Sequence, residues 1–425
     1  MKTKYLLFML GASLMPAAEQ LAAFAPTTAL RAHDQAMRLS VIKNKKYHIK
    51  VAMESSLAER AYNPEQHRTN ALTVLEKDQA SIMALRNTAP EQKAAADTIL
   101  RRMFNPADNG VRGHLKPAGS FSELSVTPNV GAQFNVAGMP GLFAVDVHVP
   151  VVRKQISNIS FADQTNTTLV PLIADLQVKK EMPNMLQNFE DLGLLHTGKW
   201  VATGLGDTAI MGSWRNWFRQ DKELVKGVEL FAQLGVTLPT GKERDEDQMF
   251  SLPLGSDGAF GIPVGLGLNV QFINTFRAGL NIDFLAYLDK AKNRRLKTHQ
   301  AQTDLFLLNK GDATKDYGLN WQFYLYLQSR HFIGGLSAKA AYQYLRHDTD
   351  KLTPRDNKFS FDVVNAAANL QEWHAHNVIF SLDYDHINSS DTLVVPQLSA
   401  FFKLPVGGKS VIAAQTVGLQ MGVSF

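Results

Sequence analysis

The chain has 425 residues, no cysteine, a formal net charge of +5 and a hydrophobic content of 45%. Without cysteine the protein has no disulfide framework, no thiol nucleophile and no cysteine-bound metal. Lys and Arg do not gather on one helical stretch, so the charge pattern does not favour a nucleic-acid partner. Beyond the N-terminus, no run of about eighteen apolar residues predicts a transmembrane helix.

The N-terminus has the layout of a secretory signal peptide. A short basic start is followed by apolar residues 5–14 and by small residues up to residue 23. The apolar part is too short to span a bilayer as a helix. We therefore expect a signal peptide over 1–23, cleaved somewhere in 18–25, and export without a helical anchor.

A first strand is predicted over 37–53, where apolar residues alternate with Lys and His. Residues 54–119 alternate poorly, and Pro90 opens a helical pattern that runs to residue 103. We expect this segment to be a long loop that carries its own helix.

Alternation of apolar and polar residues returns repeatedly in the rest of the chain. A period of two is typical of a strand with two different faces. A second long loop, with helical patches between residues 172 and 192, is predicted over 158–198. The alternating stretches are 124–136, 143–151, 200–217, 228–238, 264–272, 278–288, 319–327, 336–344, 378–384, 394–404 and 411–425. With the first strand they make about twelve, most of them close to the roughly nine to eleven residues that a tilted membrane strand needs.

The connections between these strands differ in length in a regular way. Short links such as 138–141 alternate with long, charged ones such as 239–258 and 347–371, and 406–410 is the exception. Outer-membrane barrels have short periplasmic turns and long extracellular loops, whereas a soluble β-sandwich has a polar outer face. We predict a single all-β domain over 37–425, a transmembrane antiparallel up-and-down β-barrel with long, partly helical extracellular loops.

The two faces of the strands predict what lies outside and inside the barrel. Backbone groups in lipid must all be paired, which requires a closed sheet. The apolar face then meets lipid, and the polar face lines the lumen. The candidate lumen-lining residues are Glu123, Asp146, His148, Glu229, Arg277, Asp283 and Lys339.

The last strand ends the chain on an aromatic residue. Leu419, Met421 and Val423 alternate with small or polar residues up to Phe425. The stretch resembles the closing strand of outer-membrane barrels, which present such an end to the machinery that inserts them. This resemblance implies that Phe425, Val423, Met421 and Leu419 form an assembly signal, with Phe425 at the periplasmic rim.

Two motifs resemble a known family of outer-membrane proteins. Residues 204–207 read Gly-Leu-Gly-Asp, and residues 239–241 read Pro-Thr-Gly. With the surrounding stretch 200–290, they resemble the outer-membrane transporter family associated with meta-pathway phenol degradation. The resemblance implies a channel or transporter for small molecules, apolar ones among them. Physically, Gly206 and Asp207 can seat a bend, and Pro-Thr-Gly can end a strand.

The long-chain fatty-acid transporters are a more distant resemblance. They carry Asn-Pro-Ala near the start of the barrel, together with an N-terminal plug. Here the same tripeptide occurs at 105–107, far from the expected mature N-terminus. A three-residue match at a different place does not by itself predict the same plug.

Three polar clusters admit more than one interpretation. His374 and His376 have a spacing that can bind a metal, but their parity places them on the outward face, which favours an interfacial belt with Trp373. Residues 243–247 are acidic but lack the ligand spacing of a calcium loop, which favours a solvated loop. The basic stretch 290–297 is compatible with binding lipopolysaccharide phosphates and with an unbound charged loop.

The favoured function is a channel or transporter that passes small solutes by diffusion, without a cofactor, a metal or catalytic residues. An outer-membrane hydrolase is one alternative, although no local motif groups Ser, His and Asp. A surface structural or host-contact barrel acting through its loops is another. The expected partners are outer-membrane lipid, lipopolysaccharide and the barrel assembly machinery of a Gram-negative cell. The sequence predicts neither the solute nor the oligomeric state.

Overall fold

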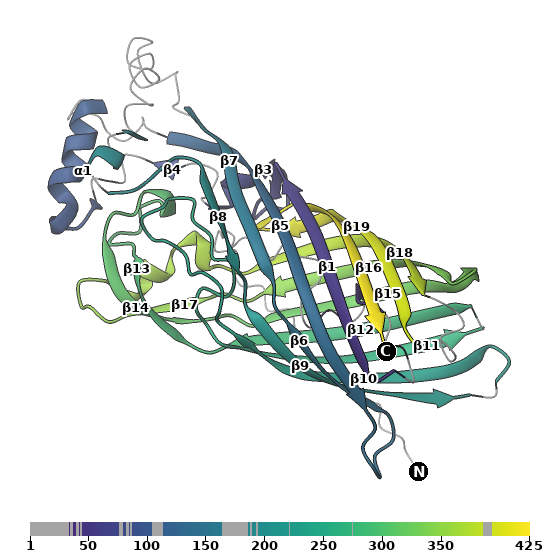
Figure 1. Ribbon diagram of the computed structural model, residues 1–425. Coiled ribbons are helices and arrows are strands. Elements are labelled where there is room, and N and C mark those ends of the chain that lie inside the picture. The colour runs from purple at the N-terminus through teal and green to yellow at the C-terminus, as the bar shows by residue number, and fades with distance from the viewer. Residues whose placement is uncertain are drawn as a thin grey trace, which may run out of the picture.

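The computed structural model describes residues 34–425 except 35–36, 40–41, 43–44, 76–79, 82–84, 86, 104–113, 164–185, 188, 193, 221, 274 and 386–392. The described chain forms a closed antiparallel β-barrel with a group of folded loops at one end (Figure 1). The predicted signal peptide and the Asn-Pro-Ala tripeptide lie outside the described residues.

The strands follow one another around the wall in the order of the chain. The fourteen elements of the ring make twelve strands, because β6 continues into β7 and β8 into β9. The prediction of a barrel of about twelve antiparallel strands is confirmed. The wall consists of β1 (Tyr47–Ala58), β5 (His114–Phe134), β6 (Leu142–His148) with β7 (Val151–Asp163), β8 (Trp200–Leu205) with β9 (Thr208–Arg219), β10 (Val225–Leu238), β11 (Gly261–Phe272), β12 (Phe276–Tyr287), β15 (Asn320–Ile333), β16 (Leu336–His347), β18 (Trp373–Asp385), β19 (Val395–Lys409) and β21 (Gln415–Ser424).

The ring closes between the first and last strands. Ile49 of β1 lies opposite Val423 of β21 on one side and Val130 of β5 on the other. Beyond β21, the Phe425 N–H donates to the Tyr47 carbonyl, and the Tyr47 N–H donates to the Phe425 carbonyl, both at 2.9 Å. Closure pairs the backbone groups that an open sheet would leave at its edges.

The two ends of the barrel differ. We term the end with the C-terminus and the short connections, such as 138–141 and 334–335, the turn end, and the opposite end the loop end. At the turn end, Gly138 and Gly141 adopt φ values of +79° and +108°, which L side chains rarely adopt. The predicted tight turn between β5 and β6 is therefore built on its glycines.

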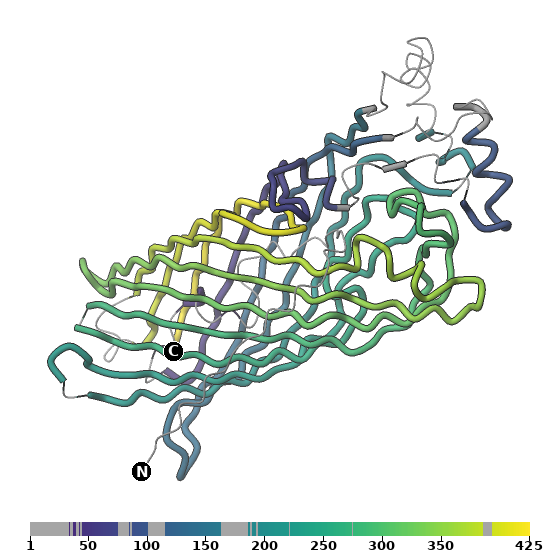
Figure 2. Tube along the Cα trace, turned by 180° about the vertical axis from the view of Figure 1, so that it is seen from behind, coloured from purple at the N-terminus to yellow at the C-terminus, as the bar shows by residue number. Residues whose placement is uncertain are grey.

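Two neighbouring strands are interrupted at the same level. Pro150 separates β6 from β7, because proline has no N–H for the ladder, and Gly206 with Asp207 separates β8 from β9. The Gly206 N–H still donates to the Pro150 carbonyl at 2.8 Å. Between this interruption and the loop end, β7 pairs with β5 on one side and with β8 on the other. These three strands extend the wall toward the loop end (Figure 2).

The alternation in the sequence becomes an apolar exterior and a polar interior. In β21, Leu419, Met421 and Val423 are between 37% and 48% exposed, whereas Gln420 and Ser424 are buried. The same pattern holds on the other wall strands, where the exposed positions are mainly Leu, Val, Ile and Phe. Such an exterior suits a lipid environment.

The loop end has secondary structure of its own. Its short strands form two small sheets, β20–β2–β3 and β13–β14–β17, and β4 pairs with β5. The elements are β2 (Arg60–Tyr62), β3 (Arg68–Asn70), β4 (Ala80–Ser81), β13 (Lys290–Arg295), β14 (Lys310–Asp316), β17 (Lys351–Pro354), β20 (Val411–Ile412), α1 (Pro90–Met103), α3 (Phe361–Asn365) and the 3-10 turns at Ala71–Leu75, Asp304–Phe306 and Ala368–Leu370. The helix α1 has the predicted range, and most of 172–192 lies outside the described residues.

Candidate functional site

The lumen is lined by polar side chains from the inward positions of the wall. The seven predicted residues all lie on this buried side of their strands. Glu123, His148, Asp283 and Lys339 are at most 8% exposed, and the side chains of Asp146, Glu229 and Arg277 are 13–15% exposed.

A histidine and carboxylate cluster joins β1, β5 and β6 inside the barrel. His48 Nε2 and Asn129 Nδ2 lie 2.7 and 3.2 Å from the same Asp146 oxygen. The His148 ring lies 3.2 Å from Asn129 Nδ2 and 3.1 Å from Arg38 Nη1. The sequence patterns did not predict Asn129 and Arg38 as lumen residues. Asn129 is uncharged and so did not stand out in the sequence, and Arg38 lies in a stretch predicted to be a wall strand.

Glu229, Arg277 and Asp283 also have polar partners. Arg277 Nη2 donates to Glu229, and Arg215 Nη1 lies 3.8 Å from the second oxygen of the same carboxylate. Asp283 accepts from Gln233 Nε2 at 2.8 Å. These contacts connect strands around the lumen, so the interior is a network of paired charges and amides.

Lys339 makes the same kind of contact in another part of the barrel wall. Its Nζ lies 3.9 Å from Asp383 Oδ2, and the Ser399 hydroxyl lies 2.6 Å from Asp383 Oδ1. The three residues come from β16, β18 and β19, which are neighbours in the ring. Charged side chains on the inward face are thus compensated within the wall.

Part of the chain before β1 lies inside the barrel, where Asp34, Leu39 and Ile42 contact the inward-facing Gln322, Gln420 and Gln133, and we term the described residues of 34–42 the lumen segment. The Leu39 N–H donates to Gln420 Oε1 at 3.3 Å, and Gln420 Nε2 donates to the Met37 carbonyl at 2.7 Å. The predicted strand over 37–53 is therefore wrong before Tyr47, where β1 begins. The Met37 N–H donates to the Asp34 carbonyl at 3.4 Å, so the segment contains a turn here, which the alternation of its residues did not reveal.

Met37 anchors the lumen segment in the middle of the barrel. Its side chain is 2% exposed and packs in a cluster with the inward-facing aromatic rings of Tyr324, Tyr326 and Phe401 and with Ile379. These residues come from β15, β18 and β19. The segment thus occupies the lumen at this level.

A hydrophobic core lies at the loop end. Phe189 and Phe306, which belong to two different connections, stack with ring centroids 5.6 Å apart, and Phe161 lies 6.3 Å from Phe306. Leu72 and Ile99, from the connection between β1 and β5, belong to the same core. The loops therefore pack against one another and do not stand apart in solvent.

The acidic and the basic stretch that the sequence shows in two different loops pair with each other. Lys292 Nζ lies 3.4 Å from Glu243 Oε2, and Arg295 Nη2 lies 2.8 Å from Asp247 Oδ1. The acidic stretch is solvated in part, since the side chains of Glu243 and Asp247 are 40% and 54% exposed while they form these ion pairs. The basic stretch has counterions within the protein, and binding to lipopolysaccharide phosphates stays a prediction. Each stretch finds its counterions in the other, because the connections β10–β11 and β12–β15 fold together.

Asp257 lies at the centre of this ion network. Its carboxylate accepts from Lys292 Nζ at 2.9 Å, from Arg294 Nη1 at 2.6 Å and from the Arg244 N–H at 2.9 Å. Burial raises the pKa of Asp257, but the charges of Arg294 and Lys292 outweigh burial and hold the pKa below its ordinary value. The aspartate is therefore ionised at neutral pH.

His374 and His376 lie on the outward side of β18 near the loop end. Their rings contact each other at 5.2 Å and Tyr344 at 5.9 and 5.0 Å. Trp373 faces the other way, because it is buried and stacks on His347, so its predicted place in the belt is wrong. Among the described residues, no group of three or more His, Asp or Glu side chains could hold a metal ion.

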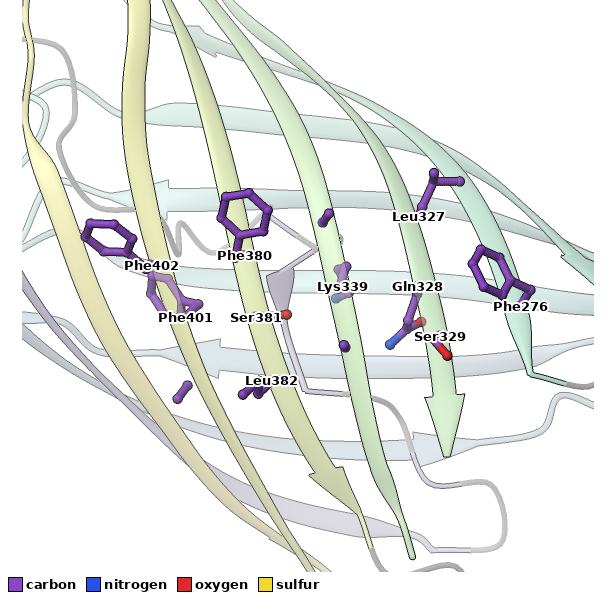
Figure 3. A pocket seen from close by; sticks show the side chains of 13 residues that line it. Phe276, Leu327, Gln328, Ser329, Lys339, Phe380, Ser381, Leu382, Phe401 and Phe402 are labelled. Carbon is purple, nitrogen blue, oxygen red and sulfur yellow. The ribbon is translucent and has the colours of Figure 1, made fainter. Parts of the chain in front are cut away.

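The wall also carries a hollow of about 600 Å³ between β12, β15, β16, β18 and β19. Figure 3 shows Phe276, Leu327, Phe380 and Phe402 around it. These four side chains are 37–56% exposed and point outward, with alanines between them. The hollow therefore belongs to the outer surface of the barrel.

Three histidines in the described part of the chain, His48, His331 and His347, contact an aspartate carboxylate. No serine hydroxyl forms a hydrogen bond with any of these rings among the described contacts. A hydrolytic triad needs such a contact. Of the described helices, none is long and apolar enough to cross a membrane.

No family model and no curated protein matches the chain. Solved structures do resemble it. An outer membrane channel from Pseudomonas putida F1 is 9% identical, with 91% of this chain and 97% of that chain covered and a TM-score of 0.51. The Pseudomonas putida toluene transporter TodX is 8% identical over 96% of this chain and 95% of that chain, with a TM-score of 0.32. A Pseudomonas aeruginosa FadL homologue is 7% identical over 90% of each chain, with a TM-score of 0.29.

At these identities the similarity concerns the fold. Of the three matches, the first has a TM-score above one half and supports a shared barrel architecture with an outer-membrane channel. The match covers nearly the whole of both chains. The chain therefore has the fold that its sequence predicts, that of an outer-membrane β-barrel.

Proposed function

We propose that the protein is an outer-membrane channel that passes small solutes by diffusion through the barrel lumen. The observation that carries this proposal is a sheet closed into a ring, whose exterior is apolar and whose interior is charged. Closure satisfies the backbone in lipid, and the polar inner face accommodates water and solute. The seven lumen residues predicted from the sequence line this path and influence which charges pass.

The proposal includes an orientation in the membrane. Outer-membrane barrels place short turns and chain ends in the periplasm and long loops outside the cell. On this rule the turn end, with Phe425, is periplasmic, and the loop end meets lipopolysaccharide. Export by a signal peptide over 1–23 and insertion by the assembly machinery, which reads the strand ending in Phe425, complete this scheme.

In the observed state, the lumen segment occupies the path. Its contacts with Gln420 and its packing around Met37 lie in the middle of the barrel, and the loop core lies at the loop end. Passage therefore requires the segment to move within the lumen or out of it. No cofactor is needed, since diffusion through a pore involves no chemical step.

The class of solute follows from resemblance. The Gly-Leu-Gly-Asp and Pro-Thr-Gly motifs resemble those of transporters associated with meta-pathway phenol degradation, which suggests small molecules with apolar parts. The charged and amide side chains of the lumen would favour solutes that also carry a polar group.

Planar-bilayer recordings of the purified protein test this function. We expect discrete conductance steps, together with slower migration on gels after heating, as folded barrels show. Lipase and protease assays on the same preparation test the hydrolase alternative. Silent bilayers with clear hydrolysis would overturn the proposal, and silent bilayers without hydrolysis would favour a structural or host-contact role for the loops.

A further inference from the structure

A cavity of about 190 Å³ lies among three connections at the loop end, β10–β11, β12–β15 and β16–β18. Residues that are far apart in the chain meet in its walls. Part of the lining is apolar and includes Leu296, Leu352 and Leu370. The basic side chains in the lining are Arg244, Arg294, Arg295, Lys297 and Lys315.

The cavity has more cations than anions in its walls. The five basic side chains face two carboxylates, Glu246 and Asp257, in the lining. Lys297 and Lys315 have counterions behind the wall, since they lie 2.9 and 2.6 Å from aspartate oxygens outside the lining. Arg295 is likewise engaged, by Asp247 and by the carbonyls of Leu307 and Leu308. The arginines at positions 244 and 294 remain, and they decide what the cavity can bind.

Arg294 is buried with part of its hydrogen-bonding capacity unused. The residue is 7% exposed, and its Nη1 donates to Asp257 at 2.6 Å. Its Nε and Nη2 atoms, and the Nε of Arg244, are buried without a hydrogen-bond acceptor among the described residues. The Tyr317 hydroxyl lies beside the Arg294 guanidinium but makes no hydrogen bond of regular geometry.

Unused guanidinium N–H groups are costly in a buried place. A buried donor without an acceptor loses its hydration and gains nothing in return. A planar carboxylate offers two oxygens that match the guanidinium fork. A bound water molecule can accept a hydrogen bond from an unused N–H group, but it makes no apolar contact with the leucine side chains of the lining.

The size of the cavity limits the ligand. Its volume of about 190 Å³ is below the roughly 300–1,000 Å³ of pockets for drug-sized ligands. A single ring or a short chain with one carboxylate combines the required size, charge and apolar surface.

We propose that this cavity binds a small monocarboxylate with an apolar body, about the size of benzoate. Its carboxylate contacts Arg294 and Arg244, and its body lies against Leu296, Leu352 and Leu370. The inference rests on the proposed channel function and adds a substrate class to it. A site at the mouth raises the local concentration of solute before it enters the lumen.

The test is calorimetric titration of the full-length protein in detergent with sodium benzoate, and with benzyl alcohol as a neutral probe of similar shape. We expect benzoate to bind and benzyl alcohol not to bind. Arg294→Gln and Arg244→Gln should each weaken benzoate binding at least about tenfold, because each removes charge-assisted donors.

Two features of the design keep the test decisive. Arg294 also binds Asp257, so Arg294→Gln can disturb the loops, whereas the hydrogen bonds of Arg244 described here use its backbone, which Arg244→Gln retains. Arg355→Gln is the matched control, because Arg355 is an exposed arginine of the same loop end outside the cavity lining. Heat-modifiable migration verifies that each variant is folded.

No benzoate binding at millimolar concentration overturns the proposal, and so does unchanged affinity in both folded variants. A cavity that holds only water gives the first of these results. Conductance without benzoate is measured in parallel and reports on the channel function separately. A conducting protein that does not bind benzoate refutes the site alone, whereas a silent protein refutes the channel function.

Discussion

Asp207 Oδ1 accepts a hydrogen bond from the Gly241 N–H at 3.1 Å, which joins the two motifs that carry the family resemblance. Asp207 Oδ2 also accepts from the Ser256 N–H at 2.6 Å, and the Thr240 hydroxyl donates to the Gly206 carbonyl at 2.7 Å. The aspartate therefore fastens both ends of the β10–β11 connection to the break between β8 and β9. The predicted structural roles of the two motifs turn out to be parts of one anchor.

Asp207→Ala removes the acceptor for both backbone donors. We expect the free energy of unfolding to fall by about 1–3 kcal/mol and trypsin to cut faster after Lys242 and Arg244. Limited proteolysis followed by mass spectrometry measures the cleavage rate. Asp289→Ala, at an exposed position, is the control. Equal cleavage rates in the two variants would show that the anchor does not hold the loop.

The lumen segment is predicted to limit conductance. Deletion of residues 34–42 removes the contacts to Gln420 and the packing around Met37, so single-channel conductance should rise several-fold. Met37→Ala should raise it less, with Met139→Ala as the control because Met139 is an exposed residue of a turn. Unchanged conductance in the deletion variant would place the barrier elsewhere, at the loop core.

Phe425 is predicted to matter for assembly more than for the stability of the finished barrel. Phe425→Ser should reduce the amount of heat-modifiable protein in the outer membrane while synthesis continues. Phe134→Ser makes the same change at another outward phenylalanine near the turn end, which is 47% exposed. Equal loss of membrane protein in both variants would mean that any exposed aromatic residue at this level serves as well.

Asp350 is predicted to make the loop end sensitive to acid. Burial raises the pKa of Asp350, but Lys315 at 2.6 Å and His347 at 3.0 Å outweigh burial and lower the pKa to about 2, from an ordinary value of 3.8. A lowered folded-state pKa stabilises the fold above the unfolded pKa, and this stability disappears as the pH falls toward the folded pKa. We expect about 2 kcal/mol to be lost between pH 4 and pH 2.

Hydrogen exchange of peptides from 348–372 measures this loss against peptides from the wall. Asp350→Asn should exchange faster at neutral pH and respond less to acid than the unmodified protein. Asp289→Asn is the control, and it should behave like the unmodified protein throughout. If acid opened the wall and the loop together, the ion pairs of Asp350 would not be the cause.

Much of the wall could be predicted from the chain because lipid and lumen impose opposite demands on alternate residues. Leu419 and Gln420 are adjacent, and one is exposed while the other is buried. The same alternation located the seven inward-facing residues. It did not reveal their partners, since His48 and Asp146 are far apart in the chain and meet through the pairing of strands.

What the sequence by itself determined is the two-faced strand, a barrel of about twelve such strands and the side to which most of their residues point, because a period of two follows from the backbone. Only the tertiary structure decided that the lumen segment lies inside the barrel, since its place depends on contacts with inward-facing residues of distant strands, such as Gln420 of β21. It also decided that Arg294 meets Asp257, because the pairing of charges between loops depends on how the barrel brings the ends of different strands together.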